Sequence, residues 1–169
     1  PAFKARQLWN FRPFLRDAPR MLGLFAIGAV IMVGFAFLLD HLGVLPDGGI
    51  FRLPREAPIV AVIIFVFYPW VSCYPQEISH RTFFFHRYEP VLGSGPTIVV
   101  VNAAVFAWFH AAFWNPWALG MTFAGGLLFA WTYLRTRSTL AVTIEHALYG
   151  WWAFMTGAGW FVYAGSVGS

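Results

Sequence analysis

Long apolar runs dominate this chain of 169 residues and restrict the folds open to it. Four of them contain no Asp, Glu, Lys or Arg, and each approaches the length of about 20 residues that a helix needs to cross a bilayer. They cover residues 21–39, 57–75, 96–114 and 117–134, and a fifth run, 138–164, contains Glu145. A transmembrane β-barrel would need alternating polar and apolar residues, which these runs lack. The sequence therefore predicts an all-α, polytopic membrane helix bundle with about five transmembrane helices.

The composition excludes several classes of protein. Hydrophobic residues make up 59% of the chain and charged residues 11%, whereas about 25% of a soluble domain is charged. This difference excludes a nucleic-acid-binding module, an ordinary cytosolic enzyme and a disordered tail, and it makes membrane lipids the expected surroundings. Cys73 is the lone cysteine, so the sequence predicts neither a disulfide framework nor a thiolate metal cluster.

Lys and Arg residues gather between the apolar runs, mostly on one side of the expected membrane. The larger group consists of Lys4, Arg6, Arg12, Arg16, Arg20, Arg81, Arg87, Arg135 and Arg137. The smaller group, on the opposite side, consists of Arg52 and Arg55. Because the cytoplasmic side carries an excess of Lys and Arg, we expect a cytoplasmic N-terminus and an external C-terminus.

The N-terminal stretch 1–20 mixes basic side chains with apolar and aromatic ones. This mixture is typical of a segment that lies among lipid headgroups, and we expect Pro13 to break it. The sequence therefore divides into a basic interfacial segment, 1–20, and a membrane helical domain, 21–169.

Ionisable side chains inside the apolar runs are costly to bury and therefore indicate function. The main candidates are Glu77, Arg81, His110 and His146. If the second helix continues past Pro75, the two histidines and Glu77 lie about 12–21 Å from the cytoplasmic ends of their helices, at 1.5 Å per residue. Glu77 and Arg81 share a helix face because they are four residues apart. We expect a polar, water-accessible cavity that holds one carboxylate and two imidazoles.

This set of side chains supports hydrolysis of an amide in two ways. A carboxylate and an imidazole can deprotonate water, while a second imidazole donates to the developing oxyanion. The same three side chains could instead bind zinc as a His₂Glu site with an open water position. In either case Arg81 would keep Glu77 ionised in a site of low dielectric constant. The residues leave both the metal and any other cofactor undecided.

Three short motifs resemble those of one family. The segment 76–81 (QEISHR) resembles EExxxR, 106–110 (FAWFH) matches FxxxH, and 146–150 (HALYG) stands where the family has HxxxN. The chain is thus similar, over roughly residues 60–155, to the CPBP (CAAX protease and bacteriocin-processing, or Abi) intramembrane proteases.

The resemblance implies a hydrolase, an intramembrane endopeptidase of the CAAX prenyl protease type, acting on a peptide or protein substrate within the membrane. By position, Glu77 and His110 would activate the water, Arg81 would be their structural partner, and His146 would donate to the oxyanion. Since many members are bacterial, it also implies the bacterial inner membrane.

Two departures from the motifs favour an alternative function. Gln76 stands at the first glutamate of EExxxR, and Gly150 replaces the asparagine of HxxxN. A glutamine is not a useful base, and the loss of one oxyanion donor costs about 10²–10³ in rate. The alternative is a catalytically silent member of the family, acting as a scaffold, an immunity factor or an accessory subunit that binds partner membrane proteins. A small transporter is a third reading, although the sequence shows no inverted repeat.

Overall fold

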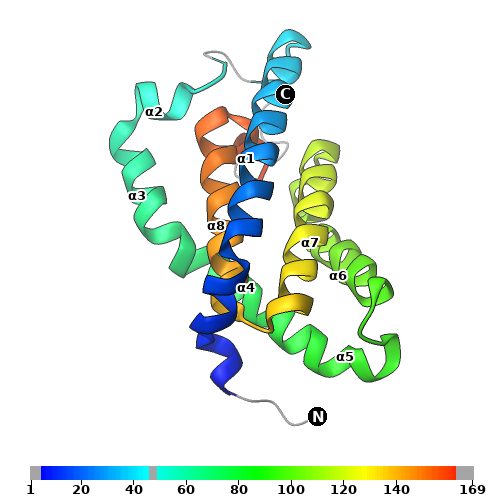
Figure 1. The fold of residues 1–169 in the computed structure, drawn as a ribbon. Helices are drawn as coiled ribbons and strands as arrows, with labels where there is room; N and C mark the ends of the chain where they lie inside the picture. The colour runs from blue at the N-terminus through cyan, green and yellow to red at the C-terminus, as the bar shows by residue number, and fades with distance from the viewer. Residues whose placement is uncertain (1–4, 46–48, 163–169) are drawn as a thin grey trace.

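The computed structural model describes residues 5–45 and 49–162, and its regular elements in these ranges are all helical. A short 3₁₀ turn, Ala5–Trp9, precedes α1 (Phe11–His41). The next elements are α2 (Arg52–Glu56), α3 (Pro58–Tyr68), α4 (Tyr74–Glu77), α5 (Phe84–Leu92) and α6 (Pro96–Phe109). The last helices are α7 (Pro116–Thr136) and α8 (Thr139–Thr156), followed by a 3₁₀ turn, Ala158–Val162. In Figure 1, α1 and α8 run side by side, with α6 and α7 on one flank and α2 and α3 on the other.

Four helical stretches of the described residues are long and apolar enough to cross a membrane. They are Phe11–His41, Pro58–Leu92, Pro96–Phe113 and Pro116–Thr136. The predicted all-α, polytopic class is therefore confirmed. The fifth apolar run forms α8 over 18 residues, but α8 is not one of these four stretches. Threonines together with Glu145 and His146 make it more polar, and it buries these side chains against α1 and α7.

The second stretch continues past Pro75, as the expected depth of Glu77 requires. Two π-helical turns, Pro69–Cys73 and Ile78–Phe83, join α3, α4 and α5 into one long helix. A proline inside a helix lacks the N–H that would close the normal hydrogen bond, so the wider turn that begins at Pro69 relieves the misfit. Glu77 ends α4, the α-helical turn between the two π-helical ones, and directly precedes the second of them.

The expected break at Pro13 is absent. Pro13 is the third residue of α1, where the backbone N–H would have no partner within the helix. Residues 11–20 are thus the first turns of the same helix that forms the first candidate span. The buried Asp17 fixes this part of α1 to α7, because its carboxylate binds Arg20 at 2.6 Å and Arg135 at 3.2 Å.

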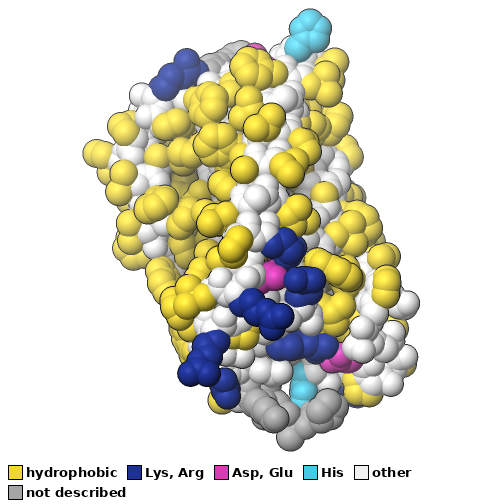
Figure 2. Space-filling model, in the orientation of Figure 1, with side chains coloured by type: hydrophobic (Ala, Val, Ile, Leu, Met, Phe, Trp, Pro, Cys, Tyr) yellow, Lys and Arg dark blue, Asp and Glu magenta, His cyan; other side chains and the backbone are white. Residues whose placement is uncertain are grey.

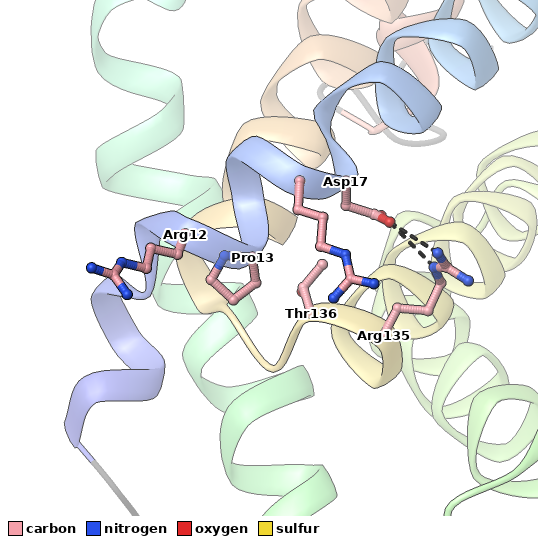
Figure 3. Close-up of a pocket in the computed structure, with 6 residues that line it drawn as sticks. Arg12, Pro13, Asp17, Arg135 and Thr136 are labelled. Carbon is pink, nitrogen blue, oxygen red and sulfur yellow. Dashed lines mark hydrogen bonds and ion pairs between the residues drawn. The ribbon is translucent and has the colours of Figure 1, made fainter.

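A cavity of about 470 Å³ lies beside this contact (Figure 3). It is lined by Arg12, Pro13, Arg16, Asp17, Arg135 and Thr136. Figure 2 shows that Lys and Arg side chains gather at this end of the molecule, next to a largely hydrophobic surface.

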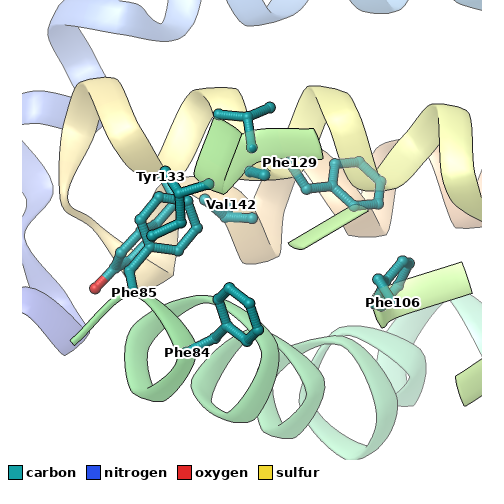
Figure 4. Packing of buried hydrophobic residues seen from close by; sticks show 9 residues of the cluster. Phe84, Phe85, Phe106, Phe129, Tyr133 and Val142 are labelled. Atoms are coloured by element: carbon teal, nitrogen blue, oxygen red, sulfur yellow. The ribbon is translucent and has the colours of Figure 1, made fainter. Parts of the chain in front are cut away.

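Side chains from four helices, most of those labelled being aromatic, form the core beside the candidate site (Figure 4). Phe84 and Phe85 come from α5, and Phe106, Phe129, Tyr133 and Val142 come from α6, α7 and α8. Next to this core, α7 lies very close to α6 at Gly126. A Cβ placed on Gly126 would come within 3.0 Å of the Ala103 Cα atom. Small residues allow such close approach between membrane helices.

We expect Gly126→Ala to lower the free energy of unfolding by about 1–3 kcal/mol, because the added methyl meets backbone that cannot move alone. Gly120→Ala is the matched control on the same helix, since a Cβ there meets nothing within 4 Å. Unfolding of both variants in detergent, followed by circular dichroism, measures the difference. Equal stability of the two variants would show that α6 and α7 can separate freely at Gly126.

Candidate active site

The centre of the site is a carboxylate that lies between a guanidinium group and an imidazole ring. Glu77 ends α4 and has no exposed surface. Its Oε1 atom lies 2.7 Å from Nδ1 of His146 in α8, and its Oε2 atom lies 3.2 Å from Nε of Arg81. The fold therefore brings together Glu77, Arg81 and His146, three of the four residues expected from the sequence.

Arg81 is completely buried, and aromatic rings supply much of its surroundings. Its guanidinium carbon lies 4.2 Å from the centroid of the Phe106 ring and 5.4 Å from that of Phe129. Contact with the face of an aromatic ring stabilises a desolvated cation. None of the three guanidinium nitrogens has a hydrogen-bond partner among the described residues, so Glu77 and these rings offset only part of the cost of burying the cation.

Each ring nitrogen of His146 has a polar partner, and the two partners fix the orientation of the ring. The ionised Glu77 carboxylate accepts a hydrogen bond at Nδ1, so a neutral imidazole carries its proton there and has its lone pair at Nε2. Nε2 lies 3.3 Å from the hydroxyl of Tyr68, the last residue of α3. The imidazole also stacks on Phe129, with ring centroids 4.7 Å apart. The Glu77 carboxylate therefore stabilises the tautomer of His146 in which Nε2 can accept a proton.

His110 lies in the 3₁₀ turn that follows α6 and is half-buried. Its Nδ1 atom donates to the Phe106 carbonyl at 2.8 Å, which leaves its lone pair at Nε2. The Phe106 ring contacts both imidazoles, with centroid distances of 4.6 Å to His110 and 5.8 Å to His146. The described residues contain no group of three His, Cys, Asp or Glu side chains close enough to hold a metal ion, so the structure does not assemble the His₂Glu arrangement.

Comparison with known protein families identifies the family of this chain. Residues 55–152, more than half of its length, match the family described as type II CAAX prenyl endopeptidase Rce1-like. The chain belongs to this family. Searches of the curated proteins and of the solved structures return no match to it.

Membership of the Rce1-like family, with four candidate spans, makes this an integral membrane protein. The matched range contains all four predicted site residues and both departures from the family motifs. Gln76 does not join Glu77, because its side-chain amide donates to the Ser72 hydroxyl at 2.8 Å. At the second departure, Gly150 lies against the Tyr68 ring.

Tyr68 was not predicted as a site residue, because it lies inside an uncharged apolar run and matches no motif. Its phenolic hydroxyl, a polar group within an apolar run, was the feature of the sequence that could have indicated it. The site is also more closed than the sequence predicted. Glu77 and Arg81 have no exposed surface, and Phe106 and Phe129 fill the space where a water-accessible cavity was predicted.

Proposed function

We propose that the protein is a membrane-embedded endopeptidase in which the Glu77–His146 pair activates water. The single observation that carries this proposal is the 2.7 Å contact between Glu77 Oε1 and His146 Nδ1, buried within a chain of the CAAX endopeptidase family. A carboxylate that fixes and charge-stabilises an imidazole is a recurring arrangement for general acid–base catalysis.

The proposed steps use this chain's own side chains. Nε2 of His146 takes a proton from water while the water oxygen bonds to the carbonyl carbon of the peptide. The imidazolium then returns this proton to the amide nitrogen as the C–N bond breaks. Glu77 stabilises the imidazolium, and Arg81 keeps Glu77 ionised. His110, which also contacts the Phe106 ring, offers a second lone pair at Nε2 that can bind water or the substrate.

We further propose that the substrate is a membrane-associated peptide or protein with a carboxyl-terminal CaaX sequence, as the family description suggests. Because the aromatic rings close the site, the substrate reaches His146 only when they move, and such opening accompanies catalysis in many enzymes.

The direct test reconstitutes the purified protein in lipid nanodiscs with a peptide that ends in CaaX, either prenylated or unprenylated on its cysteine. We expect release of the carboxyl-terminal tripeptide, detected by mass spectrometry, and no release by the His146→Ala variant. Cleavage that His146→Ala retains would indicate a contaminating protease. Absence of cleavage of both peptides by the parent protein would argue against the proposal.

A catalytically silent member of the family is the second candidate, and one observation favours it. Gln76, at the first acidic position of the motif, is neutral and donates a hydrogen bond to Ser72. The two oxygens of Glu77 lie next to Arg81 and His146 rather than next to an open space. Such a protein would copurify with a partner membrane protein, and His146→Ala would leave its cellular phenotype unchanged. A protein that purifies alone and loses its function when His146 is replaced by alanine would exclude a catalytically silent role.

A further inference from the structure

The Tyr68 hydroxyl lies beside the atom of His146 that would take the proton from water. Its oxygen is 3.3 Å from Nε2, and the two rings meet edge to face with centroids 6.0 Å apart. Phe154 of α8 holds the other side of the phenol ring, with centroids 5.3 Å apart. The hydroxyl is therefore fixed next to the proposed reaction centre by contacts from a second helix.

Gly150 provides the space that the tyrosine occupies. It lies one helical turn after His146, and a Cβ built on it would collide with the ring and the hydroxyl of Tyr68. A residue with a side chain at position 150 would force Tyr68 away from Nε2. The Tyr68 ring, which comes from α3, thus fills the space that the side chain of an asparagine at position 150 would occupy.

We propose that the Tyr68 hydroxyl is a catalytic hydrogen-bond donor to the oxyanion of the tetrahedral intermediate, in the position left open by Gly150. This inference rests on the proposed function. A donor and a base about 3 Å apart can contact the carbonyl oxygen and the attacking water of one reacting peptide at the same time.

Protonation of His146 makes the Tyr68 hydroxyl available as a donor at the step in which the oxyanion forms. Before reaction, the neutral phenol donates to the lone pair of Nε2, and at 3.3 Å this bond is long enough for a water to replace it. Once Nε2 has taken the proton from water, it has no lone pair, so the phenol hydrogen is released for another acceptor. The oxyanion that forms in the same step carries a full charge and is therefore a stronger acceptor than the Cys73 thiol beside the hydroxyl. An interaction made only as charge develops accelerates the reaction.

Tyr68→Phe removes the hydroxyl and keeps the ring over Gly150, so it separates donation from packing. We expect kcat for peptide cleavage to fall by about 10²–10³-fold with KM little changed. Tyr149→Phe is the matched control, because the Tyr149 ring similarly covers a glycine, Gly28 of α1. We expect the control to cleave at the parent rate.

A second pair of variants tests whether the hydroxyl stands in for an amide donor. Tyr68→Ala removes both ring and hydroxyl, and Tyr68→Ala combined with Gly150→Asn supplies an amide from α8 in the vacated space. Among variants that share the elution volume and thermal unfolding of the parent, we expect the double variant to be at least 10-fold faster than Tyr68→Ala, since one oxyanion donor is worth about 10²–10³.

The outcomes separate this assignment from the proposed function. An active parent with an equally active Tyr68→Phe variant would overturn the role of Tyr68 and leave the proposed endopeptidase intact. A folded double variant no faster than Tyr68→Ala would likewise overturn the substitution of a hydroxyl for an amide. A parent protein that cleaves neither peptide would overturn both proposals together.

Discussion

His146→Asn should lower kcat for peptide cleavage by about 10²–10⁴-fold, the usual contribution of a positioned general base. The asparagine amide can still donate to Glu77 from near the place of Nδ1, but it has no group at the place of Nε2 that can accept a proton. The variant therefore keeps the hydrogen bond that fixes α8 to α4 and loses the base, together with the ring contacts to Tyr68 and Phe129. Steady-state kinetics in nanodiscs, with kcat and KM determined separately, measure the effect.

His110→Asn is the matched comparison for this prediction. His110 also donates from Nδ1, to the Phe106 carbonyl, and an asparagine can make the same bond. Because His110 hydrogen-bonds to the Phe106 carbonyl, whereas His146 hydrogen-bonds to the Glu77 carboxylate, we expect its substitution to cost less than that of His146. A larger loss for His110→Asn would show that His110 is the base, which is the role that the motif resemblance assigned to it.

The sequence predicted the parts of the fold that depend on composition and helical spacing. The uncharged runs located four candidate spans, and the spacing of Glu77 and Arg81 placed both side chains on one helix face. The sequence left open whether the second helix continues past Pro75, and the structure shows that it does, which brings Glu77 to His146. These features follow from bilayer thickness and from the rise per residue of a helix.

Features that depend on contacts between helices could not be predicted in the same way. The first helix begins at Phe11 and passes through Pro13, because Asp17 and Arg135 hold its N-terminal turns on α7. Tyr68 joins the site because Gly150, far along the chain, leaves room for its ring. Hydropathy patterns contain no information on such a pairing, so Gly150 looked like the loss of a functional residue rather than space for another one.

Glu77→Gln should lower the free energy of unfolding by about 3–5 kcal/mol, the cost of leaving one member of a buried ion pair unpaired. The neutral amide can still accept from Nδ1 of His146, so the destabilisation comes from the Arg81 cation, which has no exposed surface. Combining Glu77→Gln with Arg81→Met removes both charges and keeps the volume beside Phe106 filled. We expect this double variant to regain most of the lost stability, since apolar replacements of buried ion pairs are often neutral or stabilising.

Activity should not return with stability. An amide at position 77 cannot stabilise the imidazolium that forms when His146 takes the proton from water, and loss of the analogous carboxylate in a serine protease triad costs about 10⁴ in kcat. The double variant would then be a stable but nearly inactive protein, which separates the two tasks of Glu77: neutralising Arg81 and stabilising charged His146. Parent-level cleavage by the double variant would show that the carboxylate acts only in packing. An unfolding free energy that remains as low as that of Glu77→Gln alone would show that the unpaired Arg81 is not the source of the instability.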